Sequence, residues 1–175
     1  MRTLVLGGAR SGKSAFAEAL MPAGPVTYVA TARPWPGDSD FAARIADHVS
    51  RRPSHWRTED TRDVVDVLID ASPTPVLVDD LGTWLTHVID SAQAWDRPRG
   101  TCQARIDALV RGVDTYGGGE LVLVTPEVGM GVIPEHPAGR LFRDEIGTLN
   151  GRLAQVCDKV VLVAAGLPLV LKPQT

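Results

Sequence analysis

Residues 3–14 read TLVLGGARSGKS, an apolar run that passes directly into a glycine-rich turn. The turn fits the pattern G-x-x-x-x-G-K-[ST] at every fixed position, from Gly7 to Ser14. In this pattern the glycines bring backbone N–H groups within reach of phosphate oxygens, and the helix that follows points its positive end at the same anion. We therefore predict a strand, a phosphate-binding loop and a helix at the start of the chain.

The predicted phosphate-binding loop comprises Gly7, Gly8, Ala9, Arg10, Ser11, Gly12, Lys13 and Ser14. Lys13 supplies a positive charge for the β- and γ-phosphates of a nucleotide, and the Ser14 hydroxyl is a ligand for Mg²⁺. Such a site also uses a carboxylate at the end of a neighbouring strand. The segment PVLVDD at 75–80 offers two. We expect Asp79 to orient the metal or Ser14, whereas Asp80 can instead cap the next helix.

Apolar runs rich in valine and leucine alternate along the chain with segments of helical periodicity. The expected strands are 3–6, 26–30, 76–78, 121–124 and 160–164, and the expected helices are 13–21, 40–51, 60–71, 83–93, 103–116 and 141–155. This alternation predicts an α/β fold with a mostly parallel sheet flanked by helices. Residues 164–171 read as a tight turn that adds an antiparallel edge strand. We expect one P-loop NTPase domain over residues 1–175.

Composition argues against several classes of protein. The chain has 18 Lys and Arg against 21 Asp and Glu, a net charge of −3, which disfavours a protein that coats nucleic acid or anionic membrane. Cys102 and Cys157 form no CxxC pair, so neither a disulfide framework nor a zinc site is expected. The chain also shows no signal-peptide core and no apolar run long enough for a membrane span. These features favour a cytoplasmic enzyme, with a small-molecule kinase as the simplest P-loop function.

Two further blocks add specificity to the phosphate-binding loop. The first contains ARIADH at 43–48 and RPSHWRTE at 52–59. The second contains EVGMGVIP at 127–134, followed by LFRD at 141–144 and GTLN at 147–150. Together with GGARSGKS, these blocks resemble the bifunctional adenosylcobinamide kinase/adenosylcobinamide-phosphate guanylyltransferase family of cobalamin biosynthesis. The resemblance runs nearly end to end, from Thr3 to Lys172.

The resemblance implies two reactions at or near one site. The family phosphorylates adenosylcobinamide with ATP or GTP, and then transfers GMP from GTP to that phosphate, releasing pyrophosphate and forming adenosylcobinamide-GDP. GMP is carried on a histidine, and the residue that matches is His48. The resemblance also implies a homotrimer with a corrinoid substrate, and Mg²⁺ is expected from the phosphate-binding motif.

Residue roles follow from the same resemblance. Arg44 lies four positions before His48 and shares its helical face, so Arg44 and Lys13 are expected to assist catalysis. Arg51, Arg52 and Arg57 add positive charge near the nucleotide. The residues expected to approach the nucleotide are Thr31, Ala32, Arg33 and Glu59. Glu59 is either a reader of the guanine base or a helix cap, and Glu127 or Arg143 can position the attacking hydroxyl. Weaker candidates for catalysis are Asp47, His55, His87 and His136.

The sequence departs from the family pattern at Asp80, Gly82, His87, Pro126 and Gly151. Pro126 replaces an asparagine that precedes the EVG block, so any contact made by that amide is absent. These departures concern the corrinoid side and leave the phosphate-binding loop and His48 intact. Two alternative functions remain: a P-loop kinase of another small alcohol without guanylyltransferase activity, and a non-catalytic nucleotide-responsive binding protein.

Overall fold

The computed structural model describes residues 1–32, 43 and 52–173. The strands are β1 (Arg2–Gly7), β2 (Thr27–Ala30), β3 (Arg57–Glu59), β4 (Val76–Asp79), β5 (Leu121–Pro126), β6 (Lys159–Ala164) and β7 (Leu167–Lys172). The helices are α1 (Lys13–Ala19), α3 (Val64–Ile69), α4 (Leu81–Ser91), α5 (Gln103–Asp114) and α6 (Pro137–Val156). The helix expected at 40–51 lies outside the described residues except at position 43.

The strands form one seven-stranded sheet in the order β3-β2-β4-β5-β1-β6-β7. All neighbours run parallel except β6 and β7, which are antiparallel. The predicted fold class is therefore confirmed, including its antiparallel edge strand. Register aligns Gly7 with Pro126 and Ala30 with Asp79. The carboxyl ends of β1, β2, β4 and β5 consequently meet at one edge of the sheet, where ligands of open α/β sheets bind.

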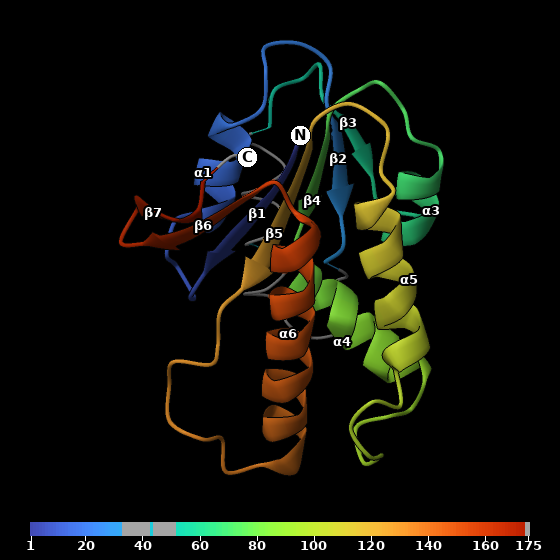
Figure 1. Ribbon diagram of the computed structural model, residues 1–175, viewed down its shortest axis with the longest axis vertical. Helices are drawn as coiled ribbons and strands as arrows, with labels where there is room; N and C mark the ends of the chain where they lie inside the picture. The colour runs from blue at the N-terminus through green and yellow to red at the C-terminus, as the bar shows by residue number, and fades with distance from the viewer. Residues whose placement is uncertain (33–42, 44–51, 174–175) are drawn as a thin grey trace.

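Helices cover both faces of the sheet (Figure 1). α1 packs on one face against Val5, Leu77 and Val124, and α3, α4, α5 and α6 bury the other face. The central strands are buried on both faces, which explains why their sequences are continuously apolar. None of the helices in the described part of the chain is long and apolar enough to cross a bilayer.

Several local features differ from the sequence expectations, among them α6, which begins at Pro137 rather than at residue 141. β3 was not expected, because its sequence RTE has no apolar run and only Glu59 is buried. α3 begins at Val64 rather than at residue 60, because the carboxylate of Asp63 accepts a hydrogen bond from the Val65 N–H and caps the helix there. α4 begins at Leu81, two residues earlier than expected, with Asp80 as its cap.

The β6–β7 hairpin is fixed at both ends. Its turn, Ala165-Gly166, has φ values of 51° and 78°, a conformation that suits glycine. At its far end the Lys172 ammonium donates to the carbonyls of Ala154, Gln155 and Cys157, the last of them at 2.6 Å. This places a positive charge at the carboxyl end of α6, where it is stabilising.

An ion pair joins the amino ends of β1 and β6, far from the ligand edge. The Arg2 guanidinium contacts Asp158 Oδ1 at 2.7 Å, and its backbone N–H donates to Asp158 Oδ2 at 2.7 Å. These hydrogen bonds from Arg2 hold the pKa of Asp158 below its ordinary value of 3.8. A carboxylate whose folded-state pKa is lowered stabilises the fold above its ordinary pKa and loses that contribution as the pH falls.

We therefore predict that Asp158→Asn lowers the free energy of unfolding by about 1 kcal/mol at neutral pH, since the pair is partly exposed. The difference from the wild type should narrow as the pH falls below 3.8. Urea unfolding at neutral and acidic pH measures both quantities. If the two proteins differed equally in unfolding free energy at both pH values, the ion pair between Arg2 and Asp158 would not be the source of the difference.

Candidate functional site

The phosphate-binding loop lies between the end of β1 and α1. Gly12 precedes the helix with φ 88°, and the Phe16 N–H donates to its carbonyl at 2.9 Å. The Lys13 ammonium folds back over the loop, 3.4 Å from the Gly8 carbonyl. Two neighbours hold the loop: the Gly166 N–H donates to the Ser11 carbonyl at 2.8 Å, and the Glu127 N–H donates to the Gly7 carbonyl at 3.1 Å. The loop is thus attached to the ends of both strands that flank β1.

Position 7 has no room for a side chain, so it requires glycine. A Cβ at this position would lie 2.3 Å from Ser11 Oγ and 2.9 Å from the Val163 carbonyl oxygen. The Ser11 Oγ itself is buried without a hydrogen-bond partner among the described residues. A buried hydroxyl is ordinarily hydrogen-bonded, so Ser11 has donor capacity available for a ligand in this loop.

Asp79 connects the phosphate-binding loop to β2. Its Oδ1 accepts a hydrogen bond from the Ser14 hydroxyl at 3.2 Å, and its Oδ2 accepts one from the Tyr28 hydroxyl at 2.7 Å. The expected pairing of Ser14 and Asp79 is therefore present. The Tyr28 hydroxyl was not anticipated, because a tyrosine within an apolar strand is read as a core residue.

The Tyr28 side chain is buried, with 1% of its surface exposed. Burial, and then the nearby Asp79 charge, raises the pKa of Tyr28, so the hydroxyl stays protonated and remains a donor. The guanidinium of Arg52 lies 3.6 Å above the centre of its ring, and the Trp56 ring lies beside it at 6.3 Å between centroids. Arg52, one of the expected nucleotide-binding residues, therefore contacts the same tyrosine that donates a hydrogen bond to Asp79.

Asp80 has a different environment from Asp79. Its Oδ1 accepts a hydrogen bond from the Thr83 N–H at 2.9 Å, which confirms it as the cap of α4. Burial, and then the charge of Asp79, raises the pKa of Asp80. Thr31, another expected nucleotide-binding residue, donates to the Asp80 carbonyl at 2.6 Å and contacts the Thr83 hydroxyl. The end of β2 is therefore tied to the start of α4.

The segment from Glu127 to Pro134 leads from β5 to α6 across the same edge (Figure 1). Arg143 fixes it by donating to the carbonyls of Gly131 at 3.1 Å and Val132 at 2.9 Å. Asn150 fixes its start, with Oδ1 accepting from the buried Thr125 hydroxyl at 2.6 Å and Nδ2 donating to the Pro126 carbonyl at 3.0 Å. Both side chains come from α6, so this helix positions Glu127 relative to the phosphate-binding loop.

Glu59 is buried at the end of β3. Its Oε1 accepts from the Thr61 hydroxyl at 2.7 Å, and from the N–H groups of Thr61 and Arg62. These bonds, the Thr61 hydroxyl first, lower the pKa of Glu59. Glu59 therefore stabilises the turn before α3, whereas Asp63 caps the helix itself. Whether Glu59 also reads a base stays a prediction.

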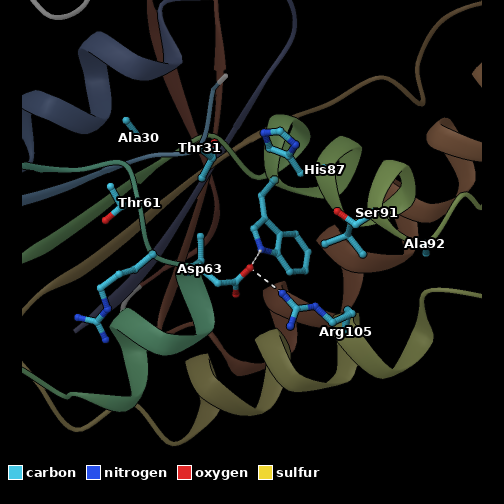
Figure 2. Close-up of a pocket in the computed structure, with 12 residues that line it drawn as sticks. Ala30, Thr31, Thr61, Asp63, His87, Ser91, Ala92 and Arg105 are labelled. Atoms are coloured by element: carbon cyan, nitrogen blue, oxygen red, sulfur yellow. Dashed lines mark hydrogen bonds and ion pairs between the residues drawn. The ribbon is translucent and has the colours of Figure 1, made fainter. Parts of the chain in front are cut away.

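A pocket of about 510 Å³ opens beside the end of β2 (Figure 2). Asp63 lies between the Trp84 indole, whose Nε1 donates to it at 3.3 Å, and Arg105, which contacts it at 2.6 Å. The lining residues include Ala30, Thr31, Thr61, Asp63, Trp84 and His87. The pocket therefore adjoins Thr31, which directly follows β2, and Thr61, the hydrogen-bond partner of Glu59. His87, one of the weaker candidates for catalysis, also lines it.

Several expected site residues lie outside the described residues: Arg33, Arg44, Asp47, His48 and Arg51. Ala32 is the last described residue of the segment that follows β2. His55 and His136 are exposed, and no hydrogen bond from the His136 side chain caps α6. In the described part of the chain, no group of three or more His, Cys, Asp or Glu side chains is placed to hold a metal ion.

Comparisons with known proteins cover nearly the whole chain. A family model described as "Cobinamide kinase / cobinamide phosphate guanyltransferase" matches residues 3–171. The chain is 39% identical over 179 residues to the "Bifunctional adenosylcobalamin biosynthesis protein CobP" of Pseudomonas aeruginosa, covering 98% of each chain. It is 38% identical over 184 residues to the "Bifunctional adenosylcobalamin biosynthesis protein CobU" of Salmonella typhimurium, covering 98% of this chain and 100% of the relative.

Solved structures agree with the fold. The chain aligns with the P4 protein of bacteriophage phi6 in complex with ADP at TM-score 0.51 and 18% identity. It also aligns with an ATPase from a bacterial type III secretion system at TM-score 0.57 and 10% identity. It covers 95% and 97% of its own length in these alignments, but only 52% and 56% of theirs. At these identities, the likeness concerns the fold alone.

The geometry at Gly7 generates a prediction about ligand binding. Gly7→Ala should weaken the binding of a nucleoside triphosphate at least about tenfold, because the new Cβ displaces the Ser11 side chain and crowds the Val163 carbonyl of β6. Gly151→Ala is the control, since a Cβ there meets open space on α6. Isothermal titration with GTP measures both. Equal affinity of the Gly7→Ala variant and the wild type would show that the loop does not hold the triphosphate.

Proposed function

The chain belongs to the cobinamide kinase / cobinamide phosphate guanyltransferase family, and from this we infer that both activities use the carboxyl edge of its sheet. It is an enzyme that phosphorylates cobinamide and then converts the phosphate to a guanylylated product. The observation that carries the location is the hydrogen bond from Ser14 to Asp79, which joins the phosphate-binding loop to the end of β4. The two alternative functions considered from sequence do not account for the family match.

We assign the triphosphate of ATP or GTP to residues 7–14. The supporting features are the turn at Gly12, the Lys13 ammonium over the loop and the Ser11 hydroxyl, which has no hydrogen-bond partner in the described part of the chain. Ser14 and Asp79 present hydroxyl and carboxylate oxygens, the ligands that Mg²⁺ prefers, so these residues fit the metal. When bound there, Mg²⁺ would neutralise charge on the β- and γ-phosphates. Magnesium commonly binds through one or two protein oxygens plus substrate phosphates, so a larger ligand cluster is not required.

We propose that His48 carries GMP between the two substrates. A ring nitrogen of His48 attacks the α-phosphorus of GTP, forming a P–N bond while pyrophosphate leaves. A phosphate oxygen of adenosylcobinamide phosphate then attacks the same phosphorus, and the imidazole leaves, giving adenosylcobinamide-GDP. Lys13 and Arg44 would stabilise the charge that develops on the phosphate. Arg51 and Arg52 would add to the positive field.

The topology supports this proposal in two ways. β2 ends at the ligand edge of the sheet, and Thr31 and Ala32 follow it there. The next described contact of this part of the chain with the sheet is that of the Arg52 guanidinium with the Tyr28 ring. His48 is four positions before Arg52 in the sequence, so covalent geometry limits their Cα atoms to about 14 Å apart. Arg52 in turn contacts Tyr28, and the Tyr28 hydroxyl donates a hydrogen bond to Asp79. For the acceptor, we propose that Glu127 faces the substrate, because Arg143 and Asn150 hold its segment at the same edge.

We propose a homotrimer as the working form, with the β6–β7 hairpin as its contact surface. Leu167 and Leu169 alternate along β7, so they share one face of this edge strand, and Leu171 follows at a register shift in the β6–β7 pairing. The three side chains are 72%, 58% and 55% exposed. An exposed apolar edge strand is ordinarily covered by another chain. A corrinoid is larger than a pocket of about 510 Å³, so a cleft between subunits suits it. We also propose a cytoplasmic location, in keeping with two free buried cysteines.

Labelled GTP tests the histidine step. Wild-type protein incubated with GTP labelled at the α-phosphate should acquire a label that is labile in acid and stable in base, as expected for a P–N bond. His48→Ala should abolish this label and the release of pyrophosphate, while cobinamide phosphorylation stays within about threefold of the wild type. Lys13→Ala should lower both activities at least about 100-fold, because both reactions use the same triphosphate site.

The same experiment separates the proposals from one another. Persistence of the label in His48→Ala would place the intermediate on another residue. Absence of any label in an active wild-type enzyme would indicate direct transfer of GMP without a covalent intermediate. Loss of phosphorylation in a folded His48→Ala variant would contradict the division of roles between His48 and the phosphate-binding loop.

The proposed contact surface predicts the oligomeric mass. The wild type should sediment as three chains of 18.7 kDa, about 56 kDa in total. Replacing Leu169 and Leu171 by Asp should yield monomers, since the charges would have to be buried against another subunit. Ile69→Asp is the matched control, because Ile69 is 71% exposed at the end of α3, away from the hairpin. A trimeric mass for the double variant would overturn the assignment.

A further inference from the structure

Tyr28 is the only described residue besides Ser14 whose side chain donates to the Asp79 carboxylate. Its hydroxyl lies 2.7 Å from Oδ2, and the Ser14 hydroxyl lies 3.2 Å from Oδ1. The two donors therefore take one oxygen each. Because a carboxylate can rotate about its χ2 bond, two donors on different oxygens define its plane in a way that one donor does not.

The register between β2 and β4 sets the position of Tyr28 relative to Asp79. The Cα of Tyr28 pairs with that of Leu77, and Asp79 lies two residues further along β4, or about 6.6 Å toward the ligand edge. A tyrosine side chain is long enough to span this distance with its hydroxyl, whereas a serine or threonine is too short. A phenylalanine would fill the same volume without supplying a donor.

The ring of Tyr28 has little freedom to move. Arg52 covers one face at 3.6 Å from the ring centre, Trp56 lies alongside, and Val161 and Val163 belong to the same buried cluster. Cation–π contacts of this kind add attraction to simple packing. The direction of the hydroxyl is consequently fixed by the surroundings of the ring, independently of any bound ligand.

We propose that Tyr28 is a positioning residue for metal-bound nucleotide: its hydroxyl holds the Asp79 carboxylate in the orientation in which Oδ1 meets Ser14 at the phosphate-binding loop. This inference rests on the proposed function of that loop. In this proposal Tyr28 acts through its hydrogen bond to Asp79 and not by contact with the triphosphate or a reacting atom. Loss of the Tyr28 hydroxyl should therefore affect the binding of metal-bound nucleotide, which uses Asp79, and not the later steps.

Tyr28→Phe tests the proposal because it removes one oxygen and keeps the ring under Arg52. We expect the affinity for GTP, measured by isothermal titration, to weaken about tenfold with saturating Mg²⁺. In EDTA the GTP affinity should stay within about twofold of the wild type, since the metal is then absent from both proteins. In steady-state turnover with adenosylcobinamide phosphate as the acceptor, the KM for Mg-GTP should rise about tenfold, with kcat within about twofold of the wild type.

Tyr116→Phe is the matched control, since the chain has only two tyrosines. The Tyr116 hydroxyl donates to the Ser72 carbonyl at 3.4 Å, before β4 begins and therefore at the opposite edge of the sheet. This variant should match the wild type with Mg²⁺ and in EDTA. Thermal unfolding in EDTA verifies that both variants are folded. A purely structural role for Tyr28 would reduce the active fraction, and hence kcat, without changing KM.

Three results would overturn the proposal: wild-type affinity of Tyr28→Phe for Mg-GTP, an equal loss of affinity in EDTA, or the same loss in Tyr116→Phe. Failure of the proposed function gives a different pattern. In that case the wild type itself would show no Mg²⁺-dependent GTP binding, or Lys13→Ala would bind GTP as tightly as the wild type. A wild type that behaves as expected beside an unaffected Tyr28→Phe refutes the role of Tyr28 alone.

Discussion

The hydrogen bond between Ser14 and Asp79 is the constraint on which the site depends. It joins the first turn of α1 to the end of β4, two elements that are 65 positions apart in sequence. α1 packs on one face of the sheet, and β4 lies two strands away from β1, so this contact fixes the phosphate-binding loop relative to the rest of the ligand edge. The neighbouring carboxylate, that of Asp80, has a different hydrogen-bond partner. Asp80 serves the Thr83 N–H as a helix cap in a buried setting, which leaves Asp79 as the carboxylate that faces the loop.

The sequence predicted the elements that have strong periodicity or a specific motif. The phosphate-binding loop, the parallel strands and the antiparallel edge follow from GGARSGKS, from apolar runs and from the turn at Gly166. β3 was missed because its pairing with β2 uses backbone groups, and its side chains carry no apolar pattern. The start of α3 was misplaced because two nearby carboxylates accept from backbone N–H groups: Glu59 in the turn before the helix and Asp63 in the first turn of the helix. Only coordinates distinguish such a turn from a helix cap.

The candidate site was predictable to a similar extent. Ser14 and Asp79 could be paired because the motif requires a partner carboxylate at the end of a neighbouring strand. Tyr28 could not be found in this way, since its role depends on how far β2 is displaced along β4. Asn150 and Arg143 were visible as parts of conspicuous sequence blocks, but their hydrogen bonds to Pro126 and to the segment after it depend on how α6 packs. Long-range register, more than residue type, separates what sequence reasoning reaches from what it misses.

The β6–β7 turn adds a requirement beyond the nucleotide motif itself. The Gly166 N–H holds the Ser11 carbonyl, and the Gly166 Cα leaves only 3.3 Å to where a side chain on Gly12 would begin. Eight consecutive residues are therefore an incomplete unit for transplantation into another scaffold. A protein engineer grafting this loop would have to supply, from some distant part of the host, a turn with a free amide at the same place. Searches for remote relatives could likewise include a small residue near the carboxyl terminus as a second signature.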